Sequence, residues 1–283
     1  REAWLADVFI DATGDGDLGA AAGCSFSMGA PLTGNVQPLS MYALFTGVRF
    51  ADIEPFVGGN LSAPKQHLYS QLAQHGLELS NSVPLLVRIH ENLFALCANH
   101  EYGVRATDAD AITRATVRGR AETHRAVETL RQLGPVWHGI RVVATSAQIG
   151  IREGRRIHGL HLVTDADILA GIRHPDAICH VTSPIDVHSL DGGAHRGIDR
   201  QHPPAQPYDI PLRALIARDV DGLMLAGRCI SGDFLAHSSY RGTGNAVVTG
   251  EAAGHAAATC IRNSVTPHEM ADSDLTATTS DPV

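Results

Sequence analysis

Residues 222–263 read GLMLAGRCISGDFLAHSSYRGTGNAVVTGEAAGHAAATCIRN. An apolar run leads into a turn at Gly227, and a second glycine-rich turn, at Gly242 and Gly244, leads into a long segment of small residues. Glycine lets backbone N–H groups approach a ligand because no Cβ stands in the way. A helix that begins at such a turn adds unpaired donors and a partial positive charge, which together suit an anionic, electron-rich group. The stretch predicts a strand and a helix, over residues 220–226 and 245–261.

A second glycine turn lies near the start of the chain, where residues 12–17 read ATGDGD. It follows a short apolar run that predicts a buried strand over residues 5–12. A short helix, ended by Gly23, is expected to follow the turn. Two interpretations stay open: a tight turn that uses Gly14 for its dihedral angles and Asp17 as a helix cap, or a contact with a cofactor.

Three further motifs occur between these two turns: IREGRRIHG, LVTDADIL and PIDVH, at residues 151–159, 162–169 and 184–188. With the two glycine turns, they stand in the order seen in one subfamily of FAD-dependent oxidoreductases. From about residue 9 to about residue 261 the chain therefore resembles the FAD-dependent oxidoreductases related to fumarate reductase and glutathione reductase. Each motif is weakly specific alone, and their order carries the resemblance.

The resemblance implies an α/β fold, with a partial three-layer FAD-binding domain and an inserted mixed α+β substrate domain. The expected FAD-binding domain is discontinuous and comprises residues 1–25 and 206–265. The expected substrate domain comprises residues 26–205, and a disordered tail comprises residues 266–283. Relatives begin with a strand–G-x-G-x-x-G–helix unit that holds the FAD pyrophosphate. No such motif followed by an acidic residue at the right distance occurs near this N-terminus, which also lacks an initiator Met. We expect a longer protein, in which a G-x-G-x-x-G-containing segment or a partner chain completes the FAD site.

The residues expected to contact FAD cluster in the glycine turns and are Thr13, Gly14, Asp15, Gly227, Arg228, Thr243, Gly244 and Asn245. A guanidinium at position 228 suits the flavin phosphates, although pairing with Asp233 is the structural alternative. Asp15 is expected to orient N–H groups or a water, because a carboxylate repels a pyrophosphate. The amides at the start of the last helix are expected at the N1–C2=O edge of the flavin, where they stabilise the reduced, negatively charged form. Ordinary helix capping is the alternative there.

Three residues are expected to act on a substrate. His237 titrates near neutrality, which suits a base that takes a hydroxyl proton. Arg241, four residues on, suits an anionic group of the substrate, or the FAD phosphates. His188 ends a predicted strand beside a mobile loop over residues 189–207, although a structural pair with Asp186 is equally open.

The function that follows is hydride transfer between a hydroxyl- or amine-bearing carbon of a small organic substrate and flavin N5, with FAD as the cofactor. The alternatives are a non-catalytic FAD-holding subunit of a heteromeric flavoprotein and a substrate-binding remnant that has lost its nucleotide half. A visible spectrum separates these hypotheses, because a bound flavin absorbs and a reduced flavin bleaches.

Composition excludes several other classes. The chain has 283 residues, 44% of them hydrophobic, and a formal net charge of −8, which argues against a nucleic-acid partner. No apolar run approaches the ~20 residues of a membrane span, and a cytoplasmic location is expected. The five cysteines form no C-x-x-C pair and are expected to be buried thiols. The 16 histidines show no metal-ligand spacing, so no metal site is predicted.

Local patterns predict the remaining elements. The charge run at residues 152–156 is expected on a solvated face, with a buried network between the domains as the alternative. A capping box at residues 107–110 is expected to start a long helix that ends at residue 133. The other expected elements are a strand over residues 41–48, a helix over residues 64–73, a hairpin of residues 83–89 with 93–98, and a strand over residues 140–144.

Overall fold

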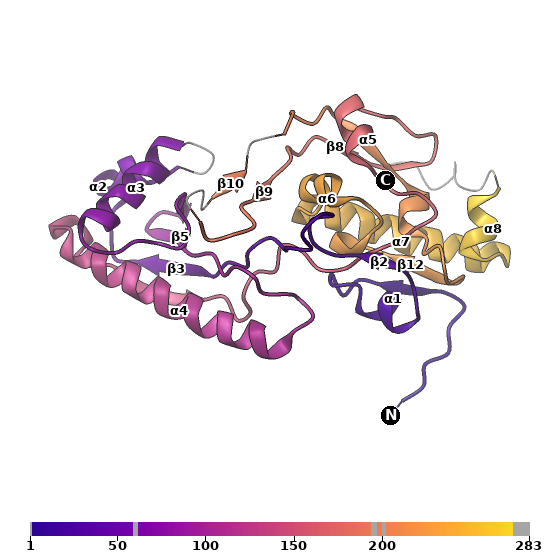
Figure 1. The fold of residues 1–283 in the computed structure, drawn as a ribbon, viewed down its shortest axis with the longest axis horizontal. Helices are drawn as coiled ribbons and strands as arrows, with labels where there is room; N and C mark the ends of the chain where they lie inside the picture. The colour runs from indigo at the N-terminus through magenta and orange to yellow at the C-terminus, as the bar shows by residue number, and fades with distance from the viewer. Residues whose placement is uncertain (1, 59–61, 194–196, 200–201, 274–283) are drawn as a thin grey trace. The chain divides into compact units, whose positions relative to one another are not determined.

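The computed structural model describes residues 2–58, 62–193, 197–199 and 202–273, and it mixes helices with sheets as an α/β chain does (Figure 1). Contacts divide the chain into two compact units. The first comprises residues 1–34, 153–187 and 200–283, and the second comprises residues 35–152 and 188–199. The first unit is therefore larger than the FAD-binding domain that the sequence predicted.

The first unit gains residues 153–187 through strand pairing. Strand β2 (Phe26–Ser27) pairs antiparallel with β7 (Arg156–Ile157). Strand β8 (Ala177–Val181) pairs antiparallel with β11 (Tyr208–Pro211). These ladders join segments that are far apart in the sequence, so the local patterns that set the predicted boundaries did not reveal them.

The predicted strands at residues 5–12 and 220–226 are present but shorter. Strand β1 (Phe9–Asp11) lies parallel to β12 (Leu223–Leu225) in a two-stranded sheet of the described chain. The predicted three-layer arrangement stays a prediction. Besides α8, described below, this unit contains the helices α1 (Asp17–Ala21), α5 (Asp165–Ala170), α6 (Phe234–Tyr240) and α7 (Thr243–Asn263). It also contains the short 3-10 turns η3 (Leu212–Leu215) and η4 (Gly227–Cys229).

The prediction of a disordered tail from residue 266 is wrong for its first residues, which form helix α8 (Pro267–Ala271). Thr266 caps the helix through its hydroxyl, which accepts from the Glu269 N–H, while the Glu269 carboxylate accepts from the Thr266 N–H. Met270 is fully buried, with its Sδ 3.7 Å from the Sγ of Cys260 on α7. A capping box and one apolar anchor are enough to order this turn. Residues 274–283 of the predicted tail lie outside the described residues.

The second unit is built on an antiparallel sheet with the order β4-β5-β3-β6. Helix α4 lies along the sheet (Figure 1), and its stripe of Ala126, Val127 and Leu130 joins the core with Phe45 and Phe94 of the sheet. The predicted strands, hairpin and helices are confirmed within a few residues. The bounds are β3 Tyr42–Thr46, β4 Leu85–His90, β5 Leu93–Cys97, β6 Arg141–Thr145, α2 Phe50–Ile53, η1 Glu54–Phe56, α3 Ser62–Gln74, α4 Ala109–Gln132, η2 Pro135–Trp137, β9 Val187–His188 and β10 Ile198–Asp199.

Helix α4 starts one residue later than the predicted capping box implies. Asp108 is the N-cap, and its side chain accepts a hydrogen bond from the Ala111 N–H at 2.8 Å. The mobile-loop prediction for residues 189–207 is also incomplete, because the described part includes strand β10 and a 2.7 Å hydrogen bond from the Ser189 N–H to the Gly197 carbonyl.

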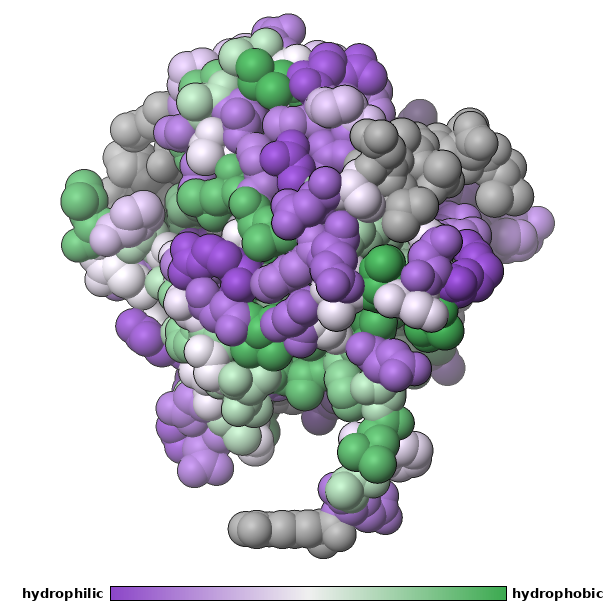
Figure 2. Space-filling view, turned by 90° about the vertical axis from the view of Figure 1, so that its right-hand side faces the viewer, coloured by the Kyte–Doolittle hydropathy of each residue, from purple (hydrophilic) through white to green (hydrophobic). Residues whose placement is uncertain are grey.

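One face of the molecule shows a mixed surface. On the face shown in Figure 2, the hydrophobic areas of the described residues lie scattered between hydrophilic ones. Such a pattern is typical of a solvated surface, because folded chains lack enough polar residues to cover themselves.

The charge run at residues 152–156 contributes a buried ion pair inside the first unit. Glu153 and Arg156 contact each other, and each is only 2% exposed. The Glu153 carboxylate also accepts from the Gly29 N–H at 2.8 Å, and the Arg156 guanidinium donates to the carbonyls of Gly29 and Gly232. The burial in the alternative is thus confirmed for these two residues, but they tie two segments of the first unit together, before residue 34 and from residue 153, and do not bridge the two units.

We expect the Glu153→Gln variant to lose about 3–5 kcal/mol of unfolding free energy, because it leaves a buried guanidinium without a counter-charge. Glu251→Gln on α7 is the control, since Glu251 and its neighbour His255 are both 59% exposed. Urea unfolding measures both. A loss below about 1 kcal/mol in Glu153→Gln would show that the buried pair does not stabilise the unit.

Candidate functional site

The parallel pairing of β1 and β12 brings the two glycine turns of the sequence side by side. Asp11 is in register with Leu225, and the Ala226 N–H donates to the Asp11 carbonyl at 2.9 Å. Because parallel strands run in one direction, the turns that follow them begin at the same edge of the sheet. This edge, outside the carboxyl ends of the strands, is where α/β sheets bind ligands.

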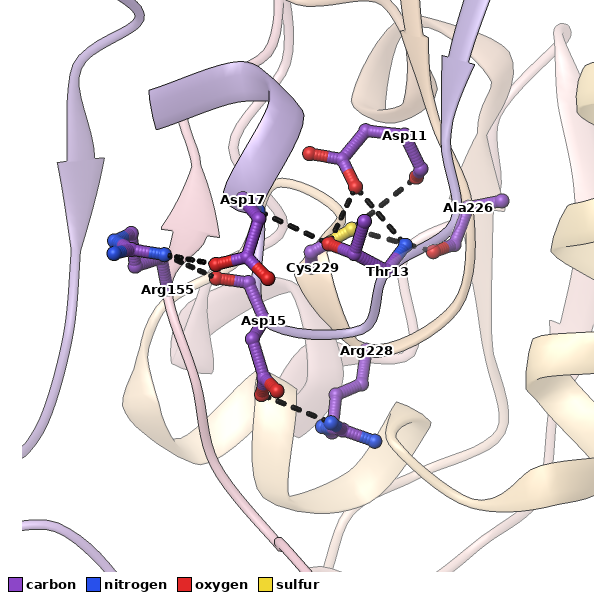
Figure 3. Close-up of polar contacts among 8 residues, drawn as sticks. All are labelled: Asp11, Thr13, Asp15, Asp17, Arg155, Ala226, Arg228 and Cys229. Atoms are coloured by element: carbon purple, nitrogen blue, oxygen red, sulfur yellow. Dashed lines mark hydrogen bonds and ion pairs between the residues drawn. The ribbon is translucent and has the colours of Figure 1, made fainter. Parts of the chain in front are cut away.

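Asp11 organises the first turn. Its buried carboxylate accepts from the Thr13 N–H at 3.0 Å, from the Thr13 hydroxyl at 2.7 Å and from the Gly19 N–H at 2.8 Å (Figure 3). The Thr13 hydroxyl in turn accepts from the Asp17 N–H at 3.0 Å, so Thr13 takes the capping role that the sequence assigned to Asp17. The sequence placed Asp11 beside the turn but did not predict that its carboxylate holds the turn together.

An ion pair joins the two turns. Arg228 donates from Nη2 to Oδ1 of Asp15 at 2.9 Å (Figure 3). Asp15 thus binds a guanidinium, whereas the sequence predicted that it orients N–H groups or a water. The suggested structural partner of Arg228, Asp233, instead caps helix α6 by accepting from the Ala236 N–H. The Nε of Arg228 is buried and has no partner among the described residues, which leaves a donor for a ligand.

The backbone conformation and the neighbouring Arg228 explain why residue 14 is a glycine. Its φ of 78° lies in the left-handed region, and a Cβ there would lie 2.8 Å from Nη2 of Arg228. The glycine therefore serves the turn and the guanidinium, as the structural interpretation of the turn holds.

The turn also carries a spacing that sequence reasoning passed over, since Gly14, Gly16 and Gly19 fit G-x-G-x-x-G between a strand and a helix. No acidic residue follows at the distance typical of a dinucleotide site, which is why the spacing was set aside. A Cβ on Gly16 or on Gly19 would lie 2.9 Å from side-chain carbons of Ile157. These two glycines therefore allow close packing against β7.

Helix α7 begins without a side-chain cap. Its N-cap is Gly242, which offers no side chain to the first N–H groups, whereas α4, α5, α6 and α8 have side-chain caps. A Cβ on Gly242 or Gly244 would meet no atom of the described chain within 4 Å. The helix is held at this edge by the Gly227 N–H, which donates to Oγ1 of Thr249 at 3.0 Å. Open space beside an uncapped start, at Thr243, Gly244 and Asn245, fits an anionic edge of a ligand.

His237 lies on α6 in the first unit and is fully buried. Neither ring nitrogen makes a hydrogen bond of good geometry within the described residues, and a weaker hydrogen bond with the Arg228 backbone acts to raise the pKa of the ring. Burial, and then the guanidinium charges of Arg156, Arg241 and Arg228, hold the pKa of His237 well below its usual value, so the ring is neutral at neutral pH. A neutral imidazole has a lone pair that accepts a proton.

Arg241, the C-cap residue of α6, is held by Asp186. Its Nη2 donates to the Asp186 carbonyl at 2.7 Å and to the Asp186 carboxylate at 3.1 Å. Asp186 therefore pairs with Arg241, and the suggested structural pair of Asp186 with His188 stays a prediction. Helix α6 brings His237 and Arg241 together, one turn apart.

His188 belongs to the second unit, where it ends strand β9. Its N–H donates to the side-chain oxygen of Gln37 at 3.0 Å. Its ring lies edge-to-face with the ring of His100, with centroids 5.0 Å apart. Sequence reasoning did not single out His100, although the polar run after the apolar strand β5 was a signal for it.

We expect stability to fall in acid because of His237. Its pKa is lower in the folded chain than the ~6.5 of an unfolded chain, so the unfolded state binds the extra proton first. Stability is therefore complete above pH ~6.5 and falls below it, by up to about 1.4 kcal/mol per pH unit. Urea unfolding at pH 7.5 and 5.5 tests this, with His237→Leu as the comparison. An equal pH dependence in the two proteins would contradict it, since His158 and His161, whose pKa values are also lowered, remain in both.

Comparison with known proteins agrees with the site. The sequence profile of the FAD dependent oxidoreductase family matches residues 1–278. This chain belongs to that family. No curated protein and no solved structure shows a significant match. Membership of the FAD dependent oxidoreductase family makes the protein an oxidoreductase enzyme and makes FAD its cofactor.

Three other observations bear on the sequence predictions for this family member. All five cysteines are buried and unpaired, as expected. Within the described residues, no group of three or more His, Cys, Asp or Glu side chains is arranged to hold a metal ion. No helix of the described chain is both long and apolar enough to cross a membrane.

Proposed function

We propose that the first unit holds FAD at the carboxyl ends of β1 and β12, and that the enzyme transfers a hydride between a small organic substrate and flavin N5. The reacting carbon of the substrate carries a hydroxyl or an amine. The observation that supports the FAD site is the meeting of three features at one sheet edge. They are the turn at Thr13, Gly14 and Asp15, the turn at Gly227 and Arg228, and the uncapped start of α7.

The residues present fit FAD. Arg228 has a buried Nε without a partner in the described chain and offers its charge to the phosphates. The amides of Thr243, Gly244 and Asn245 suit the N1–C2=O edge, because fixed donors there stabilise negative charge. Bound FAD supplies the hydride acceptor at N5. The protein's own part is to orient that group and to set its electrostatic surroundings.

The substrate roles follow from charge and protonation. His237 is neutral and suits a proton acceptor, and Arg241 suits an anionic group of the substrate. Both are anchored on α6, which fixes their geometry. A substrate role for His188, which lies in the second unit, stays a prediction.

We also propose that a G-x-G-x-x-G-containing segment or partner chain completes the grip on the FAD pyrophosphate. Strand β1 supports this proposal, because Phe9 and Ile10 are 39% and 36% exposed. Strands of parallel sheets are usually covered on both faces.

A visible spectrum of the purified protein tests the proposed function. Flavin absorbance near ~450 nm that bleaches when an alcohol or amine donor is added anaerobically supports it. Donors are screened as a panel of small hydroxy acids, alcohols and amines. A protein that takes up no FAD when it is supplied would contradict the proposal, and bound FAD that no donor bleaches would favour the non-catalytic FAD-holding alternative.

A further inference from the structure

The segment that leads into β7 lies against the first glycine turn of the first unit. A Cβ on Gly154 would lie 2.8 Å from the Cα of Asp15, and a Cβ on Gly16 would lie 3.2 Å from the Cβ of Arg155. The backbone and the side chains of this segment therefore pack directly on residues 15–17. The proposed FAD site uses Asp15 of this turn and gives Arg155 no role.

Three contacts fix the side chain of Arg155. Its Nη1 donates to the Asp15 carbonyl at 3.0 Å and to the Asp17 carboxylate at 2.7 Å (Figure 3). Its guanidinium carbon lies 5.4 Å from the centre of the Phe26 ring. The side chain of Arg155 is 18% exposed, whereas that of Asp17 is 63% exposed. A guanidinium that contacts a carboxylate, a carbonyl and a ring face at once is held in one geometry, so Arg155 holds the turn in place.

Asp15 is held at its main chain and at its side chain. Arg155 binds its carbonyl, and Arg228 binds its carboxylate at 2.9 Å (Figure 3). The side chains of Arg228 and Asp15 are 27% and 16% exposed, so water screens their ion pair only in part. A shift of the Asp15 main chain would move its carboxylate and, through it, the Arg228 guanidinium that we assign to the FAD phosphates.

The charges of the turn are paired one to one. The guanidinium of Arg155 pairs with the carboxylate of Asp17. The guanidinium of Arg228 pairs with the carboxylate of Asp15. A further carboxylate, that of Asp11, is buried and accepts hydrogen bonds from N–H groups. Loss of the Arg155 charge would leave Asp17 uncompensated beside the place proposed for the FAD diphosphate, and like charges repel.

We propose that Arg155 is a positioning residue for the diphosphate of FAD. It fixes the main chain of Asp15, and thereby Arg228, and it neutralises the Asp17 carboxylate. The turn then accepts an anion. Arg155 acts through these residues and does not itself bind the cofactor. The inference rests on the proposed function, because that function places FAD at this turn.

Titration of FAD into the purified, flavin-free protein tests the proposal, at low ionic strength, where charge effects are least screened. In Arg155→Gln the dissociation constant of FAD should rise about tenfold or more, because ionic hydrogen bonds to the turn are lost. In the double variant Arg155→Gln with Asp17→Asn most of that loss should be recovered, since the uncompensated carboxylate is removed as well. A residue that only stabilised the fold would show no such recovery.

Arg218→Gln is the matched control, because it removes the same charge elsewhere in the first unit. Arg218 is 52% exposed and pairs with Asp219 at 3.0 Å. Its loss should leave the dissociation constant of FAD unchanged. Thermal unfolding checks that each variant is folded.

Equal FAD affinity in the wild type and in Arg155→Gln would overturn the proposal, and so would a double variant that binds FAD no better than Arg155→Gln. If Arg155→Gln does not fold, Asp17→Asn alone carries the test. It leaves Arg155 with an uncompensated charge and should bind FAD about threefold more tightly than the wild type, so an unchanged affinity would overturn the proposal. A wild-type protein that takes up no FAD would overturn the proposed function and this inference with it, whereas equal affinities overturn this inference alone.

Discussion

The Gly244→Val variant should fold as stably as the wild-type protein and bind no FAD. A Cβ at position 244 meets no atom of the described chain within 4 Å, and the φ of this residue is not positive. Valine is also a better helix residue than glycine. The valine side chain would fill the space that we assign to the flavin edge. The variant should therefore lose FAD binding without losing stability.

Gly14→Val is the matched contrast. Its Cβ would lie 2.8 Å from the Arg228 guanidinium, in a backbone conformation that valine disfavours. This variant should lose stability as well as FAD. Thermal unfolding and the bound-flavin absorbance of the two variants separate the roles. Full flavin occupancy in Gly244→Val would show that the start of α7 is not the flavin seat.

The His237→Leu variant should keep its FAD and its stability at pH 7, and reduce its flavin roughly 10²–10⁴-fold more slowly. Both ring nitrogens are buried and make no hydrogen bond of good geometry within the described chain. A buried polar atom that lacks a good hydrogen bond destabilises the fold, so an apolar side chain of similar volume is neutral or stabilising there. If His237 served stability alone, the variant would instead be less stable and would reduce its flavin at the wild-type rate.

Stopped-flow reduction with the donor found in the bleaching screen measures the rate, and urea unfolding measures stability. Ser238→Ala on the same helix is the control, because the Ser238 hydroxyl donates to the Phe234 carbonyl within the same helix. An unchanged reduction rate in His237→Leu would remove His237 from the chemistry.

Elements with a strong local pattern were predictable from the sequence. The stripe of α4, the β4–β5 hairpin and the glycine-led start of α7 each depend on neighbours within a few residues. Helix α8 was missed because its capping box, Thr266 and Glu269, sits in a polar segment that composition alone assigns to disorder.

The contacts that complete the site are long-range, and local patterns do not encode them. Asp15 and Arg228 are 213 residues apart in the sequence, so local patterns did not predict their ion pair. The burial of Glu153 and Arg156 likewise depends on Gly29, which is more than a hundred residues away.

The pairing of Phe9 with Leu223 has a consequence for biosynthesis. A ribosome that adds 5–20 residues per second makes the second of these residues roughly 10–40 s after the first. Throughout that interval the nascent N-terminal strand has no partner, and its apolar side chains stand open to chaperones. The proposed FAD site is therefore complete only after translation has passed the final long helix.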